Sequence, residues 1–127
     1  GIALISLIVG GVGIMNTMYT SVLERTRDIG IMKAIGAKNS DIFWLFLIES
    51  GLLGMSGGAI GILIGIGMSK LVEIGARDFA GNLLKANFST SLIIGAMAFS
   101  FLVGAISGVM PAKQASKMQP VEALRYD

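Results

Sequence analysis

Long uninterrupted runs of apolar residues, separated by short polar segments, dominate the pattern along the chain. Residues 1–23 contain no charged side chain, residues 42–68 contain Glu49 as their one charge, and residues 89–110 contain none. As a helix, the first run is roughly 35 Å long, enough to cross a bilayer. Each run is apolar on all faces instead of along one stripe, which favours membrane spans over the buried helices of a soluble bundle.

The pattern predicts an all-α integral membrane fold with one transmembrane domain. The expected elements within residues 1–127 are spanning helices over 1–27, 42–72 and 89–110, a short helix at about 28–36, and a short helical tail over 111–127. The second helix is roughly 46 Å long, more than the roughly 30 Å hydrocarbon core, so it should tilt or protrude.

Composition narrows the function further. Hydrophobic residues make up 54% of the 127 residues and charged residues 14%, which is far below the roughly 25% of soluble chains. The net charge of +2 comes without a dense basic run, which argues against nucleic acid as a partner. The sequence has no cysteine and no histidine, so it predicts no disulfide, no thiolate metal site and no imidazole catalysis. Because Gly1 lies inside an apolar run, we interpret the chain as part of a longer protein.

The distribution of basic residues predicts an orientation in the cell membrane. Seven of the ten Lys and Arg residues lie in the loop 24–41 or after Met110, and three lie between the second and third spans. Loops rich in Lys and Arg stay in the cytoplasm. We therefore expect the loop 24–41 and the C-terminus to be cytoplasmic and the N-terminal end to be extracytoplasmic.

Glycines recur at helix-packing distances in two spans. Small residues four apart form a flat strip on which two helix backbones approach closely in lipid. The strips are Gly57, Gly61 and Gly65, with Gly54 and Gly58 on the neighbouring face, and Gly104 with Gly108. The alternative is that these glycines have no packing role and reflect only the general abundance of glycine in membrane helices. Whether such strips serve contacts within the chain or between two copies is left open.

The segment after the first span is amphipathic and carries charges of both signs. Ile31 and Ile35 are four residues apart, and Ile29 and Met32 are three apart. Gly36 is well placed to end this short helix. Two interpretations are equally compatible with the local pattern: a docking element for a partner, or an interfacial turn whose basic residues only set the topology.

Glu49 requires a partner or a proton if it lies inside the membrane, because an unpaired carboxylate there is costly. It lies roughly 10 Å beyond Asp41 along the helix. Asn16 and Thr17 are at a similar depth and are candidate partners in a polar contact between helices. The alternative is that the Glu49 side chain reaches the interface. In the tail, Pro111 should stop the third helix, and Pro120 can begin a short helix over Val121–Tyr126.

Several separate motifs in order resemble the FtsX-like permease family, the membrane subunits of macrolide-exporter and lipoprotein-release ABC transporters. The resemblance covers the whole chain. It is carried by Met15-Asn16-Thr17-Met18, Val22-Leu23-Glu24-Arg25-Thr26-Arg27-Asp28-Ile29-Gly30, Lys33-Ala34-Ile35-Gly36-Ala37, Phe46-Leu47-Ile48-Glu49-Ser50, Pro111-Ala112-Lys113-Gln114-Ala115-Ser116 and Pro120-Val121-Glu122-Ala123-Leu124-Arg125.

The resemblance implies four membrane helices with a large extracytoplasmic domain after the first, of which this chain would hold the last three helices. It also implies a second membrane subunit and a cytoplasmic ABC ATPase, which binds ATP and Mg²⁺, so that this chain binds no cofactor. The short helix would be a coupling helix docked on the ATPase. In that role Ile29, Ile31, Met32 and Ile35 would enter a groove, and Arg25, Arg27, Asp28 and Lys33 would form ion pairs at its rim.

The resemblance implies a non-enzymatic membrane subunit that transmits ATP-driven motion across the membrane to export or extract a substrate. An alternative is a non-transport regulator that activates an extracytoplasmic partner such as a wall hydrolase or a sensor. A third hypothesis is a small membrane scaffold with no ATPase.

Overall fold

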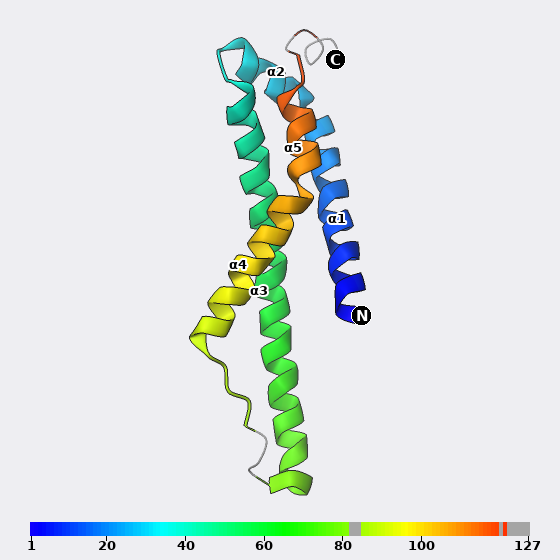
Figure 1. Cartoon of the computed structure of the whole chain (residues 1–127), viewed down its shortest axis with the longest axis vertical. Helices are drawn as coiled ribbons and strands as arrows, with labels where there is room; N and C mark the ends of the chain where they lie inside the picture. Colours follow the sequence, from blue (N-terminus) through cyan, green and yellow to red (C-terminus); the bar gives the residue numbers. More distant parts are fainter. Residues whose placement is uncertain (82–84, 120, 122–127) are drawn as a thin grey trace.

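The computed structural model describes residues 1–81, 85–119 and 121, and over these residues the chain is helical with no strand. The helices are α1 (Ile2–Glu24), α2 (Thr26–Ala34), α3 (Asn39–Ala80), α4 (Thr90–Ser107) and α5 (Val109–Ser116). In Figure 1, α3 is the long rod, α4 crosses it, and α5 lies between α3 and α1. The short α2 caps one end of this bundle.

Three of the described helices are long and apolar enough to cross a membrane, which confirms the predicted all-α membrane fold. Their bounds differ from the expected ones, because α1 ends at Glu24, α3 runs from Asn39 to Ala80, and α4 ends at Ser107. With 42 residues, α3 is roughly 63 Å long, about twice the hydrocarbon thickness. One part of α3 therefore extends beyond the bilayer.

A single residue, Arg25, separates α2 from α1. Its backbone (φ −103°, ψ 18°) bends the chain, yet its N–H still donates to the Ser21 carbonyl at 3.0 Å and its carbonyl accepts from the Ile29 N–H at 3.0 Å. The Thr26 hydroxyl donates to the Leu23 carbonyl at 2.8 Å. The hydrogen-bond ladder thus runs through the bend, and α2 is a redirected continuation of α1.

Gly36 ends α2, as the sequence predicts. Its φ of 108° is unfavourable for residues with a Cβ. The Ala37 N–H donates to the Met32 carbonyl at 2.9 Å and the Gly36 N–H to the Lys33 carbonyl at 3.2 Å, the paired bonds of a Schellman motif. The next helix, α3, begins after Lys38, whose backbone N–H donates to the Asp41 carboxylate at 3.0 Å. The chain turns back toward the membrane within a few residues.

Pro111 bends the third span instead of ending it. Proline has no N–H, and its ring collides with the carbonyl four residues earlier, which here belongs to Ser107. The helix accordingly breaks at Gly108 and resumes as α5, in which Pro111 is the third residue, where a missing N–H leaves no bond unmade. The prediction that the helix stops at Pro111 was wrong, since α5 continues to Ser116.

The closest helix crossing joins α3 to α4 through glycine. A Cβ on Gly54 would lie 2.4 Å from the Ser100 carbonyl oxygen and 2.8 Å from the Gly104 Cα, and a Cβ on Gly108 would meet the Ser50 hydroxyl. Gly104 and Gly108 thus pack within the chain. In contrast, a Cβ on each residue of the strip Gly57, Gly61 and Gly65 would meet nothing within 4 Å.

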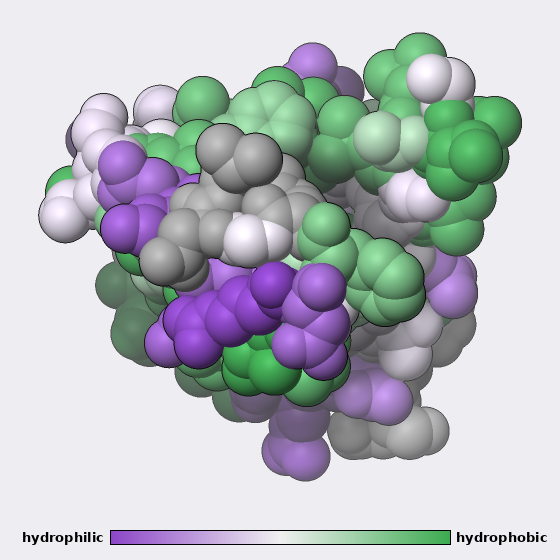
Figure 2. Space-filling model, turned by 90° about the horizontal axis from the view of Figure 1, so that it is seen from below, coloured by the Kyte–Doolittle hydropathy of each residue, from purple (hydrophilic) through white to green (hydrophobic). Residues whose placement is uncertain are grey.

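The buried core lies at the end of the bundle that α2 caps. Four helices, α1, α2, α3 and α5, supply it, and its fully buried apolar side chains are Met18, Val22, Ile29, Ile42, Phe46, Ala112 and Ala115. Seen from the opposite end, hydrophilic residues gather around the tip of α3 with hydrophobic residues on the flanks (Figure 2). Phe79 at that tip is 97% exposed. Most of the predicted helix Val121–Tyr126 lies outside the described residues.

Candidate functional site

The outward face of α2 is the candidate coupling surface. Ile31 is 44% exposed and Ile35 is 82% exposed. These two side chains are roughly 40° apart around the helix axis, so they share one face. Arg27 and Asp28 are exposed beside them. We call Ile31 and Ile35 the coupling face, because exposed apolar residues rimmed by charges are typical of a docking surface.

The opposite face of α2 packs on the bundle. Ile29 is fully buried in the core, and Met32 is partly buried against it. Two residues along a helix turn the side chain by roughly 200°, so Ile29 and Ile31 must face opposite sides. The expectation that Ile29 would enter a groove on a partner was therefore wrong, and Met32 contributes mainly to the core side.

Arg25 at the bend contacts α3 through two side chains. Its guanidinium donates to both carboxylate oxygens of Glu49, at 2.9 and 3.1 Å, and lies 5.2 Å from the centre of the Phe46 ring. The Arg25 and Glu49 side chains are each a little over one third exposed. Arg25, predicted to form an ion pair with a partner, instead forms one within the chain.

Glu49 has Arg25 as its partner and not the predicted Asn16 or Thr17. Both of those residues are exposed on α1. The Thr17 hydroxyl donates to the Gly13 carbonyl of its own helix at 3.0 Å, as a hydroxyl in lipid needs an acceptor within reach. The physical reason for the difference is that the bend after Glu24 turns Arg25 toward α3, which charge counting along the loop does not reveal.

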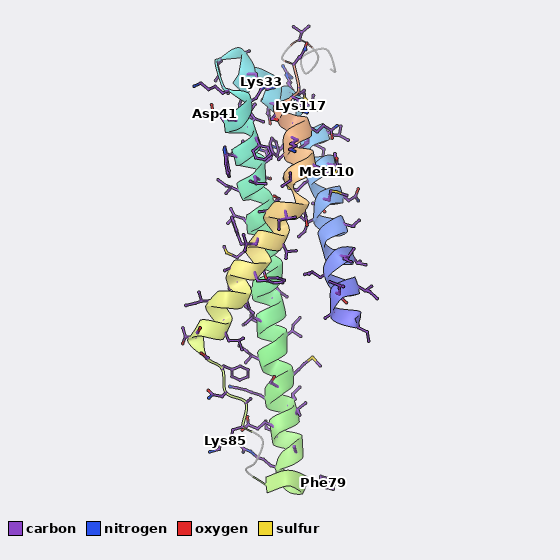
Figure 3. All side chains as sticks on the ribbon, in the orientation of Figure 1. Lys33, Asp41, Phe79, Lys85, Met110 and Lys117 are labelled. Carbon is purple, nitrogen blue, oxygen red and sulfur yellow. The ribbon has the colours of Figure 1, made fainter. Side chains whose placement is uncertain are left out.

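Lys33 extends from α2 to the C-terminal end of α5. Its ammonium group donates to the backbone carbonyls of Ser116 and Met118. Ser116 is the last residue of α5, where carbonyls have no partner within the helix, and Met118 lies just beyond that end. The helix dipole makes this end negative, so a lysine there is favourable. Burial lowers the pKa of Lys33 from its usual value. Figure 3 shows Lys33 near Lys117 at this end, with Phe79 and Lys85 at the other.

The candidate site consists of apolar and charged side chains on a short helix. In the part of the chain that the structure describes, no group of three or more His, Cys, Asp or Glu residues could hold a metal ion. Two serine hydroxyls of the bundle donate within their own helices: that of the fully buried Ser50 to the Leu47 carbonyl and that of the partly buried Ser107 to the Val103 carbonyl, both at 2.8 Å. What remains is a short helix held on its inner side and open on its outer side.

A comparison of the sequence with protein-family models decides the family. The model described as FtsX-like permease C-terminal matches residues 1–120. The chain belongs to the FtsX-like permease family. The resemblance inferred from the motifs is thereby confirmed, and with it a multi-pass membrane protein of the permease type.

Curated relatives of this FtsX-like permease are ABC transporter proteins. They include an uncharacterized ABC transporter permease of Methanocaldococcus jannaschii, 49% identical over 98% of this chain and 31% of its own length. The uncharacterized ABC transporter permease YknZ of Bacillus subtilis is 48% identical over 99% of this chain and 30% of its own. The macrolide export ATP-binding/permease protein MacB of Agrobacterium fabrum is 46% identical over 99% of this chain and 19% of its own length. The chain spans less than a third of the length of each.

Two contacts of this FtsX-like permease escaped sequence reasoning: Arg25 with Glu49, and Lys33 with α5. A usable signal for the first exists, because Glu49 is the one charge in its run and Arg25 is the first basic residue after the preceding span. The second has no comparable signal. It depends on backbone carbonyls that become available only because α5 ends beside α2.

Proposed function

We propose that this chain is the C-terminal membrane part of an ABC permease and transmits ATP-driven motion from a cytoplasmic ATPase across the membrane, to export or extract a substrate. The observation that carries the proposal is the coupling face, in which Ile35 is 82% exposed while Ile29 on the opposite face of α2 is fully buried. ATP and Mg²⁺ would be bound by the ATPase and not by this chain.

The distribution of basic residues supports a cytoplasmic position for the α2 end. Arg25, Arg27, Lys33 and Lys38 lie in or next to α2, and Lys113 and Lys117 lie at the end of the chain that meets it. Positive residues mark the cytoplasmic side. The N-terminal end of α1 is then extracytoplasmic, and the tip of α3 extends beyond the outer surface.

The relatives support the ATPase partner and favour transport over regulation. The relative MacB is named as a macrolide export protein that combines ATP binding with a permease. An apolar helix face rimmed by charges fits a groove on such an ATPase, with Ile31 and Ile35 buried and Arg27 and Asp28 at the edge. We expect two membrane subunits in the working transporter, so that closure of paired ATPases moves both.

The proposal predicts that negative charge on the coupling face weakens docking of the ATPase. In the full-length permease, Ile31→Asp combined with Ile35→Asp would place two carboxylates against an apolar groove, and binding of the isolated ATPase should weaken at least about tenfold. Binding is measured by titrating the ATPase onto the permease in lipid nanodiscs.

Gln119→Asp is the matched control for this experiment. Gln119 is exposed at the same end but lies off α2, so the substitution adds a negative charge without touching the coupling face. We expect its ATPase affinity to equal that of the wild type. Equal affinity of the double variant and the wild type would contradict the proposal.

A further inference from the structure

Two polar contacts hold α2 to the bundle, one near each end of the helix. At the start, the Arg25 guanidinium joins the bend to α3 through Glu49 at 2.9 Å. At the other end, the Lys33 ammonium joins α2 to α5 through the carbonyls of Ser116 and Met118. The two contacts reach different helices, so α2 bears on α3 and α5 at once.

The Arg25 contact is built as a fitted site on α3. Phe46 and Glu49 are three residues apart and therefore lie on one face of that helix. The ring of Phe46 supports the guanidinium at 5.2 Å while the carboxylate accepts its hydrogen bonds. Phe46 is itself fully buried. Phe46 and Glu49 thus hold the Arg25 side chain from two sides. Because the guanidinium is planar, its hydrogen bonds to Glu49 also fix the direction of the side chain.

The Lys33 contact is a cap on α5 supplied by another element. Lys33 reaches 83 and 85 residues along the chain to the two carbonyls that it binds. Ala115 and Ser116 beside it are buried, and α5 packs on both α3 and α1. The position of α5 is therefore tied to the position of α2 through a charged donor.

Apolar packing alone would hold α2 weakly and without a fixed direction. A helix of nine residues is marginal by itself. One fully buried apolar side chain on α2, Ile29, contributes to the core, and contacts between apolar side chains are non-directional. The hydrogen bonds of the two charged groups fix the direction of α2, because the strength of a hydrogen bond falls steeply when donor and acceptor are misaligned.

We propose that Arg25 and Lys33 are positioning residues that couple α2 to α3 and α5, so that a displacement of α2 moves these helices with it. The inference rests on the proposed function, in which the ATPase displaces α2 through the coupling face. Ile31 and Ile35 receive the displacement, and the two cations pass it on to two different helices. Loss of either cation leaves α2 able to bind the ATPase but unable to move the bundle fully.

Spin-label distances in the full-length permease with its ATPase, in lipid nanodiscs, test this assignment. The chain has no cysteine, and four exposed positions serve as label sites. Ala34→Cys with Gln114→Cys reports the distance from α2 to α5. Leu4→Cys with Ser69→Cys reports the distance between α1 and α3 far from α2. Both distances are measured without nucleotide and after trapping with ATP and vanadate.

In the wild type we expect ATP trapping to shift the Leu4–Ser69 distance while the Ala34–Gln114 distance stays narrow and unchanged. We call the ATP-induced change of the Leu4–Ser69 distance the far shift. In Arg25→Gln and Lys33→Met the far shift should fall by at least half, and in Lys33→Met the distribution of Ala34–Gln114 distances should broaden. ATPase affinity should fall far less than in the variant that combines Ile31→Asp with Ile35→Asp. Lys117→Met is the matched control, because it removes an exposed positive charge at the same end and should keep the full shift.

A full far shift in both Arg25→Gln and Lys33→Met would overturn the inference. If the single variants fail to assemble, the charge-swapped variant Arg25→Glu with Glu49→Arg decides: a shift of wild-type size supports the ion pair, and its absence overturns it. Failure of the proposed function would look different. In that case the wild type itself would show no far shift on ATP trapping, whatever the variants do.

Discussion

The two ends of this FtsX-like permease are built in different ways. At the end that α2 caps, four helices share a core whose side chains, among them Met18, Ile29 and Phe46, are fully buried, and charged groups cross between helices. Toward the other end, α3 continues with exposed apolar residues such as Leu63 and Leu71, both 71% exposed. A Cβ added to Gly57, Gly61 or Gly65 of the glycine strip would meet no described atom within 4 Å there.

The contrast has a physical cause in the solvent. Within the bilayer, lipid tails are as apolar as leucine, so no hydrophobic force gathers bare helices together, and close approach at small residues or polar contact must do so. The α2 end has both, because Gly54 meets Gly104 nearby and Arg25 meets Glu49. Among the described residues, the far half of α3 makes no such contact with another helix; Glu73 there accepts from the Ala86 N–H at 3.4 Å and pairs with Arg77 of its own helix at 3.5 Å. One end is therefore a rigid unit, and the other is open to movement or to other segments.

An apolar groove marks where the bundle begins to open. Gly10 and Gly11 of α1, Gly57 and Gly58 of α3 and Val103 of α4 are among the residues that line it, and its free volume is about 340 Å³. Above this level α1 packs on α5, and below it α1 and α3 separate (Figure 1). The groove therefore marks the boundary between the rigid end and the open end.

The largest expected effect is the difference in stability between substitutions of two phenylalanines, one at each end. Phe46→Ala removes a fully buried ring at the α2 end together with its contact to Arg25, and we expect the free energy of unfolding to fall by at least about 2 kcal/mol. Phe79→Ala at the open end removes a ring that is 97% exposed and should change it by less than about 0.5 kcal/mol. Reversible unfolding by SDS in mixed micelles measures both. Equal losses would contradict the distinction between the ends.

A smaller difference in stability is expected between substitutions of two glycines of α3. Gly54→Ala would place a methyl group 2.4 Å from the Ser100 carbonyl oxygen, so α3 and α4 must move apart, at a cost of about 1–3 kcal/mol. Gly61→Ala meets no atom within 4 Å and should stabilise the helix by about 0.5–1 kcal/mol. The same SDS unfolding compares them. A loss of stability in Gly61→Ala would show that its face is covered in the working protein.

Hydrophobic runs and charge placement were enough to predict most of the fold. The three spans, the short helix before Gly36 and the all-α class follow from periodicity and from local capping rules, which act over a few residues. Helix ends were less predictable. The end of α3 at Ala80 lies eight residues beyond the expected 72, and Gly81, with a φ of 59°, follows its last residue.

The candidate site was only partly predictable, because it depends on which face of α2 turns inward. Ile29 and Ile31 look equivalent in sequence, yet one is fully buried and the other is 44% exposed. The single-residue bend at Arg25 sets that choice. The same bend brings Arg25 to Glu49 and Lys33 to α5, contacts between residues 24 and more than 80 positions apart that local rules do not reach.

Site-specific photo-crosslinking tests the central claim, that the α2 end receives the ATPase, most directly. A photo-reactive residue is introduced in place of Ile35 or, as the comparison, in place of Phe79 in the full-length permease assembled with its ATPase in nanodiscs. Both positions are highly exposed, at 82% and 97%. The account predicts an adduct with the ATPase from position 35 and none from position 79. An adduct from position 79, or none from position 35 in an assembled complex, would contradict it.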